Sequence, residues 1–132
     1  MLRYAYGIFA SEASLNDNQQ ISAKDFFSHL TLRKPGTTKM SFVVGVWGFE
    51  KGETASVRLE VVTPSDQKLT GKWITRNSKD EIHVQSAIFN VSKIPFEVEG
   101  IYKFLLYNND TEELFGERYL KVTFSQGGET YE

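Results

Sequence analysis

The chain has 132 residues, no cysteine and a formal net charge of −2. This length predicts one domain with its own hydrophobic core. The missing cysteine excludes disulfides, zinc ribbons and thiol catalysis. Acidic and basic residues are balanced in both halves, which argues against nucleic acid because phosphate binding needs accumulated positive charge.

Apolar and polar residues alternate along most of the chain, the period of half-buried β-strands. The aromatic content of 14% also favours strands. No convincing amphipathic helix or internal repeat interrupts the pattern. The alternating segments are, in chain order, residues 3–10, 21–32, 40–49, 55–64, 68–75, 82–91, 100–108 and 114–123.

The first twenty residues do not form a signal-peptide pattern, because Arg3 and Glu12 interrupt the apolar run. We expect a first strand there. No segment approaches the roughly 20 apolar residues that span a bilayer, so no membrane partner and a cytoplasmic location are expected. Residues 21–32 predict one broken strand or two short ones, with a helical turn over 22–29 as the alternative.

Apolar residues occupy both faces of segment 40–49, which predicts a central, well-covered strand. Trp47 stands there between Gly45 and Gly48, a spacing that predicts a bulge or a bulky ring packed over bare backbone. Segment 55–64 alternates more cleanly, with Ala55, Val57, Leu59 and Val61 expected inward. It ends in a predicted turn over 64–67.

Residues 96–124 predict a closing hairpin. Asn108, Asn109 and Asp110 are residues that tolerate left-handed backbone and form local hydrogen bonds, as a hairpin turn requires. On the return strand, the alternation places Leu114 on the same face as Leu120. The expected core residues of this hairpin are Phe104, Leu106, Leu120 and Val122.

The step Gly100-x-Tyr102 resembles the tyrosine corner of immunoglobulin-like sandwiches, in which the tyrosine hydroxyl bonds to upstream backbone. Trp47 could serve as the core tryptophan of such a fold, and Phe104 stands where its second cysteine is expected. The predicted fold is therefore an all-β, immunoglobulin-like sandwich of seven to nine mostly antiparallel strands. Residues 1–125 form the domain, and residues 126–132 form a flexible tail.

A wider likeness covers most of the chain. Its pieces resemble a functionally uncharacterised family of small bacterial and phage-borne β-sandwich proteins. The resemblance implies this fold and a bacterial or phage origin, and it implies no activity. The matching pieces are Val44–Gly48, Gly52-Glu53, Val57–Pro64, Phe89–Phe96 and Gly100–Leu106.

Chemical motifs are absent from the sequence. His29 and His83 stand without a marked partner, and no nucleophile-elbow motif accompanies the serines. The acidic clusters near 80 and 110 do not follow calcium-loop spacing, and the glycines lack the context of a phosphate-binding loop. We expect no catalytic residue, no metal and no cofactor.

One segment combines basic and aromatic residues. Lys72, Trp73 and Arg76 form a predicted contact patch, because tryptophan and arginine are enriched in protein-binding hot spots. The leading hypothesis is a non-enzymatic protein-interaction module whose partner is another protein or, through the sheet edges, a second copy. The alternative is a module that binds carbohydrate or single-stranded nucleic acid on exposed aromatics.

Overall fold

The computed structural model describes residues 2–16, 20–48, 54–77 and 84–125. For residues 54, 55 and 70–77 it describes the backbone alone. This part of the chain contains nine strands. They are β1 (Arg3–Leu15), β2 (Ile21–Phe27), β3 (His29–Leu32), β4 (Ser41–Trp47), β5 (Thr54–Val62), β6 (Lys68–Asn77), β7 (Gln85–Asn90), β8 (Gly100–Asn108) and β9 (Glu113–Phe124).

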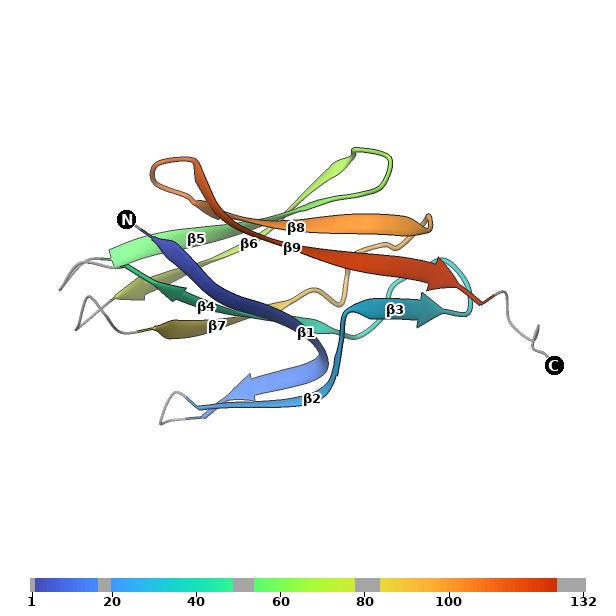
Figure 1. Ribbon diagram of the computed structural model, residues 1–132, viewed down its shortest axis with the longest axis horizontal. Coiled ribbons are helices and arrows are strands. Elements are labelled where there is room, and N and C mark those ends of the chain that lie inside the picture. Colours follow the sequence, from blue (N-terminus) through green and yellow to red (C-terminus); the bar gives the residue numbers. More distant parts are fainter. Residues whose placement is uncertain (1, 17–19, 49–53, 78–83, 126–132) are drawn as a thin grey trace.

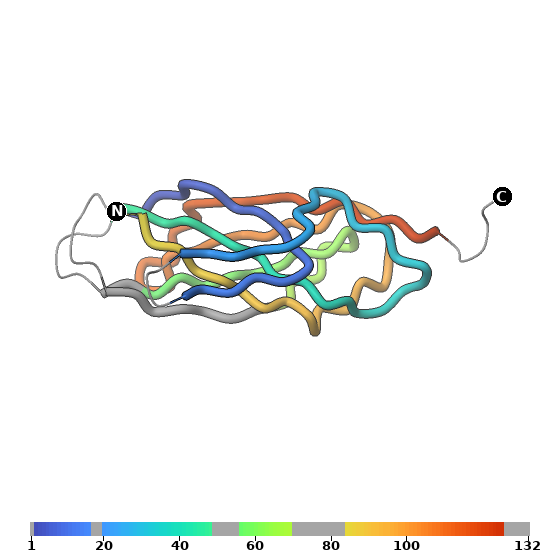
Figure 2. Tube along the Cα trace, turned by 90° about the horizontal axis from the view of Figure 1, so that it is seen from below, coloured from blue at the N-terminus to red at the C-terminus, as the bar shows by residue number. Residues whose placement is uncertain are grey.

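The strands form two sheets that face each other (Figure 1). One has the order β2-β1-β4-β7, and Figure 2 looks onto it. The other has the order β3-β9-β8-β5-β6. An immunoglobulin sandwich pairs its strands A, B and E in one sheet and C, F and G in the other. Strands β1, β4 and β7 match the first set and β5, β8 and β9 the second, so the predicted immunoglobulin-like sandwich is confirmed.

The predicted break in segment 21–32 lies at Ser28, where the chain leaves β2 and enters β3 in the opposite sheet. Both parts are strands, so the helical alternative was wrong. Because the chain crosses between sheets here without a hairpin, β3 pairs with β9 in parallel, starting at His29 opposite Lys121. The remaining described strand pairs are antiparallel.

Three phenylalanine rings connect the two sheets. Phe9 of β1 and Phe42 of β4 lie with ring centroids 4.9 Å apart, and both contact Phe104 of β8 edge-on at 4.8 and 5.3 Å. All three side chains are fully buried. Phe104 and Phe42 therefore occupy the centre of the sandwich, where antibody domains place a disulfide between their B and F strands. Aromatic contacts hold the sheets together in this chain.

The tyrosine corner is present. The Tyr102 hydroxyl donates a hydrogen bond to the Val98 carbonyl at 2.7 Å, and the ring packs edge-on against Phe96. Gly100 has a φ of +136°, and a Cβ there would lie 2.8 Å from the Pro64 side chain. The glycine is therefore needed twice, for the backbone conformation and for close packing on the β5–β6 turn. Burial raises the pKa of Tyr102.

The closing hairpin differs from expectation at its tip. Phe104, Leu106, Leu120 and Val122 are fully buried, as predicted. The β8–β9 register shifts after Leu106, where Leu106 pairs with Gly116 but Tyr107 pairs with Leu114. This β-bulge reverses the alternation beyond it. Leu114 is consequently 43% exposed, and its predicted place on the core face was wrong.

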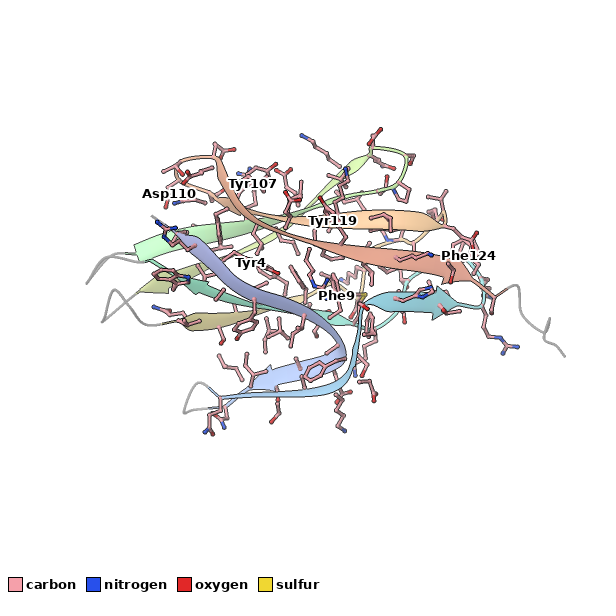
Figure 3. All side chains as sticks on the ribbon, in the orientation of Figure 1. Tyr4, Phe9, Tyr107, Asp110, Tyr119 and Phe124 are labelled. Atoms are coloured by element: carbon pink, nitrogen blue, oxygen red, sulfur yellow. The ribbon has the colours of Figure 1, made fainter. Side chains whose placement is uncertain are left out.

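A charged residue also occupies the inward row of β9. Arg118 donates from Nε to the Gly7 carbonyl of β1 at 2.9 Å, and its guanidinium lies 5.7 Å from the centre of the Phe9 ring. Arg118 thus links the two sheets where β1 passes β9. Figure 3 shows Tyr4 and Phe9 between the sheets in the same region.

The described residues include no helix long and apolar enough to cross a membrane. The predicted tail, residues 126–132, lies outside the described residues.

Candidate functional site

The predicted contact patch lies on β6. Trp73 is the register partner of Arg58 on β5, and Arg76 is the partner of Ala55. Lys72 falls at the register shift between the Arg58 and Glu60 pairings. The side chains of Lys72, Trp73 and Arg76 lie outside the described residues, so the patch stays a prediction.

The first histidine lies on an exposed edge. His29 Nε2 is 2.9 Å from Thr123 Oγ1, a neighbour on the parallel strand β9. His83 lies outside the described residues. No group of three or more His, Cys, Asp or Glu side chains in the described part of the chain could hold a metal ion. The arrangement around His29 indicates a strand-edge contact, because the described partner of its ring is a threonine hydroxyl and not a carboxylate.

A connected polar network lies on the outer face of the five-stranded sheet and centres on Arg58. Its guanidinium donates two hydrogen bonds to Glu112, at 2.8 and 2.9 Å, and one to Asn109 at 2.8 Å. Nε donates to Glu60 at 3.1 Å. The same guanidinium lies 4.8 Å from the centre of the Tyr107 ring. Arg58 thereby ties the middle of β5 to the β8–β9 turn.

This network explains the conformation of the turn. Asn108 accepts a backbone hydrogen bond from Asp110 through its side chain, as predicted, but the left-handed residue is Glu112, with a φ of +61°. Left-handed backbone is costly for a residue with a long side chain. The two-pronged Arg58 contact offsets that cost. It also lowers the pKa of Glu112, chiefly through the hydrogen bond. Figure 3 shows Tyr107 and Asp110 at this turn.

A groove of about 490 Å³ lies beside the same turn. Trp47 at the end of β4 and Leu114 at the start of β9 are its exposed apolar side chains, at 37% and 43%. The Arg3 guanidinium lies 5.5 Å from the centre of the Trp47 ring, a cation–π contact. We call this the Trp47 groove. Its lining residues are Leu2, Arg3, Tyr4, Trp47, Glu113, Leu114 and Phe115.

The proposed role of Trp47 as a core tryptophan was wrong. Val46 is 3% exposed and belongs to the core, so alternation turns the next residue away from it. The core tryptophan of immunoglobulin domains stands on strand C, which corresponds to β5, whereas Trp47 stands on β4. In β5 the buried positions are filled by Val57, Leu59 and Val61.

The outer face of the four-stranded sheet has a different character. The Tyr6 ring lies across Gly45, and its hydroxyl is 2.7 Å from Ser86 Oγ on β7. A ring over bare backbone was predicted near Gly45, but the ring comes from β1. Val43 is fully buried on this face, between half-buried Ile8 and Ile88.

Comparisons with known proteins support the fold alone. No family model matches the chain, and no curated protein matches it. An immunoglobulin-like protein from Pseudomonas aeruginosa is 17% identical over 93% of this chain and 97% of its own, with a TM-score of 0.44. A β-glucosidase from Listeria innocua, solved in complex with glucose, is 8% identical over 94% of this chain, with a TM-score of 0.55. This chain spans 16% of that enzyme's length.

Sequence reasoning missed the Arg58 network and the Trp47 groove. Both depend on the β8–β9 turn, which places Glu112 and Leu114 beside residues more than fifty positions earlier in the chain. The sequence contains no signal for the Arg58–Glu112 contact or for the approach of Leu114 to Trp47, because residue spacing does not show which strands become neighbours. The exposure of Trp47 could have been inferred from the alternation of β4 once Val46 was assigned to the core.

Proposed function

We propose that the chain is a non-enzymatic protein-interaction module that binds a protein partner in the Trp47 groove. The observation that carries the proposal is the pair of exposed apolar side chains, Trp47 and Leu114, on opposite sheets and facing one groove. Tryptophan, tyrosine and arginine are the residues most enriched in binding hot spots. Trp47, Tyr4 and Arg3 bring all three together here.

The groove suits an apolar side chain of a partner, with polar contacts at its rim. Arg3 contacts the Trp47 ring, and Arg58 binds Glu112 of the turn, two residues before Leu114. The groove is therefore preorganised, which lowers the entropic cost of binding. Glu113 and Arg3 both line the groove and offer one charge of each sign to the partner.

The position of the groove supports the same function. Figure 1 shows the start of β1, the end of β4 and the β8–β9 turn at one end of the sandwich. The β8–β9 turn corresponds to the F–G loop, which contributes to the binding site in antibody variable domains. The likeness in fold carries no partner identity, because unrelated functions share this architecture.

Affinity capture from the cell of origin tests the proposal, using the tagged chain and two groove variants, Trp47→Ala and Leu114→Lys. Both side chains are exposed, so the variants are expected to fold. The matched control is Ile101→Lys, which changes an equally exposed residue on the outer face of β8. We expect mass spectrometry to find a partner that the wild type and the control retain and both groove variants lose. A partner retained by both groove variants would contradict the proposal.

The ligand-binding alternative rests on Trp73 and stays a prediction. Trp47 and Trp73 are the two tryptophans, so a Trp47→Phe variant reports Trp73 fluorescence alone. We expect no change in that signal on titration with glucose or a single-stranded oligonucleotide. A saturable change would favour the ligand-binding module over the protein-interaction module.

A further inference from the structure

The four edge strands of the sandwich differ in how they resist pairing with another chain. Strand β3 has only four residues. Strand β2 has left-handed backbone at Asp25, with a φ of +55°, and its pairing with β1 skips that residue between Lys24 and Phe26. Strand β6 carries Lys68, Lys72 and Arg76. Short length, irregular backbone and basic residues are the usual devices that block edge-to-edge pairing.

Strand β7 carries none of these devices. Its sequence, QSAIFN, contains no charged residue, no proline and no glycine. Its ladder with β4 runs without a register shift from Gln85, opposite Val46, to Asn90, opposite Ser41. No strand lies beyond it among the described residues. A regular, uncharged strand at the edge of a sheet is a template for one more strand.

The outer surface next to this edge is also uncharged. Val43, Ile8 and Ile88 form an apolar row across β1, β4 and β7, and Tyr6 and Ser86 form the row beside it. Figure 2 shows β7, in yellow, beside β4 on this side of the molecule. A neighbouring sheet that continued these rows would meet no charged side chain among the residues of β4 and β7.

We propose that a second copy of the chain pairs with this edge, β7 against β7, antiparallel and centred on Ile88. The two four-stranded sheets would then form one continuous sheet related by a two-fold axis, a closed and self-complementary interface. The distribution of charged residues on the edge strands favours β7 as the strand that pairs with a second copy. Self-pairing of β7 brings no like charges together, whereas self-pairing of β6 would oppose lysines and arginine.

The alternation of β7 restricts the register, and the match between side chains selects it. Both copies keep their cores on the same side of a continuous sheet only if core-facing residues pair with core-facing residues. A centre on any residue of β7 satisfies this condition, and a centre at Ile88 also pairs side chains of similar polarity. It places Ile88 opposite Ile88, Ala87 opposite Phe89, and Ser86 opposite Asn90. A centre at Ala87 would instead place Ser86 opposite Ile88.

Single-cysteine variants test both the pairing and its register, because the wild type contains no cysteine. Directly opposed residues of an antiparallel pair have Cα atoms about 4.5–5.5 Å apart, within disulfide range. We expect mild oxidation to link Ile88→Cys into a dimer on a non-reducing gel. Ser86→Cys and the control Ile101→Cys should remain monomeric, since neither faces its own copy. Equal linkage of all three variants, or linkage of Ser86→Cys alone, would overturn the proposal.

Sedimentation equilibrium of the unmodified chain provides the second readout. We expect a concentration-dependent dimer for the wild type and about a hundredfold weaker association for Ile88→Lys, because facing like charges cost several kcal/mol. Circular dichroism checks that the variant is folded. A monomer at all concentrations for the folded wild type would overturn the proposal. Trp47→Ala should dimerise normally, so failure of the dimer and failure of the Trp47 groove are distinguishable.

Discussion

The two outer faces of the sandwich are built from the same alternating pattern but differ in chemistry. The five-stranded sheet presents charged side chains outward, including Arg58, Glu60, Lys103 and Glu117. The central rows of the four-stranded sheet present none within the described residues. Their outward positions hold tyrosine, serine and aliphatic side chains, among them Tyr6.

The difference shows two ways in which side chains on an outer sheet face can be held in place. On the charged face, Arg58 uses hydrogen bonds to fix a distant turn and to order neighbouring side chains. On the uncharged face, Tyr6 lies flat over Gly45 and closes the surface by packing. A packed, uncharged surface can join another sheet without desolvating charges, whereas the charged surface cannot. Contacts with a second copy are therefore expected on the four-stranded side.

The largest expected effect comes from the core that both faces share. Phe104→Ala removes the ring that contacts Phe9 and Phe42 across the sheets. Truncation of a fully buried phenylalanine costs about 3–5 kcal/mol. Urea unfolding should show this loss in the free energy of unfolding. A loss below 1 kcal/mol, about the size of one hydrogen bond, would mean that the two sheets are held together elsewhere.

The next effect distinguishes the uncharged face. Gly45→Ala would place a methyl group into the Tyr6 ring, so the ring would have to shift from its position beside Ser86. Overpacking of this kind costs about 1–3 kcal/mol. Thermal unfolding measures the loss. Tyr6→Phe is the matched control, because it keeps the ring and removes only the contact with Ser86. If Gly45→Ala were neutral, close packing would not be what closes this face.

A smaller effect is expected at the tyrosine corner. Tyr102→Phe keeps the buried ring and removes the hydrogen bond to Val98. One such bond contributes about 0.5–1.5 kcal/mol to stability. Chemical denaturation should show a lower midpoint with an unchanged slope. An unchanged midpoint would show that the corner positions the chain without stabilising it.

The smallest effect belongs to the charged face and depends on pH. Arg58 lowers the pKa of Glu112 below its ordinary 4.5, so this pair stabilises the folded state above that pH. The contribution is lost as pH falls below 4.5 and through the lowered value. Glu112→Gln should therefore destabilise the chain slightly at neutral pH and flatten the acid side of the stability profile. Melting temperatures between pH 3 and pH 7 measure this, roughly the range over which carboxylates titrate. A profile parallel to the wild type would contradict the Arg58 contact.

The strands were predictable because the alternation of apolar and polar residues is a property of neighbouring residues in the sequence. Residues 40–46 showed apolar side chains on both faces, and the structure buries every residue of β4 except Trp47. The tyrosine corner was predictable because Gly100 and Tyr102 stand within one local motif. The turns at 64–67 and 108–110 were predictable for the same local reason.

The candidate site was not predictable in this way. Leu114 reaches the Trp47 groove because a bulge after Leu106 reverses the alternation of β9. A bulge depends on how two strands register against each other, which single-strand periodicity does not contain. The predicted patch at Lys72, Trp73 and Arg76 came from composition, and composition does not reveal which surface is shaped to bind.

The sequence by itself determined that this chain forms short alternating strands, a tyrosine corner and no disulfide, since these follow from local residue patterns. Only the tertiary structure decided that Arg58 meets Glu112, that Tyr6 covers Gly45 and that Trp47 faces a groove. Those contacts join residues far apart in the chain, and strand order and register bring them together. The physical reason is that alternation sets the face of each residue, whereas its neighbours on that face depend on how the strands pair.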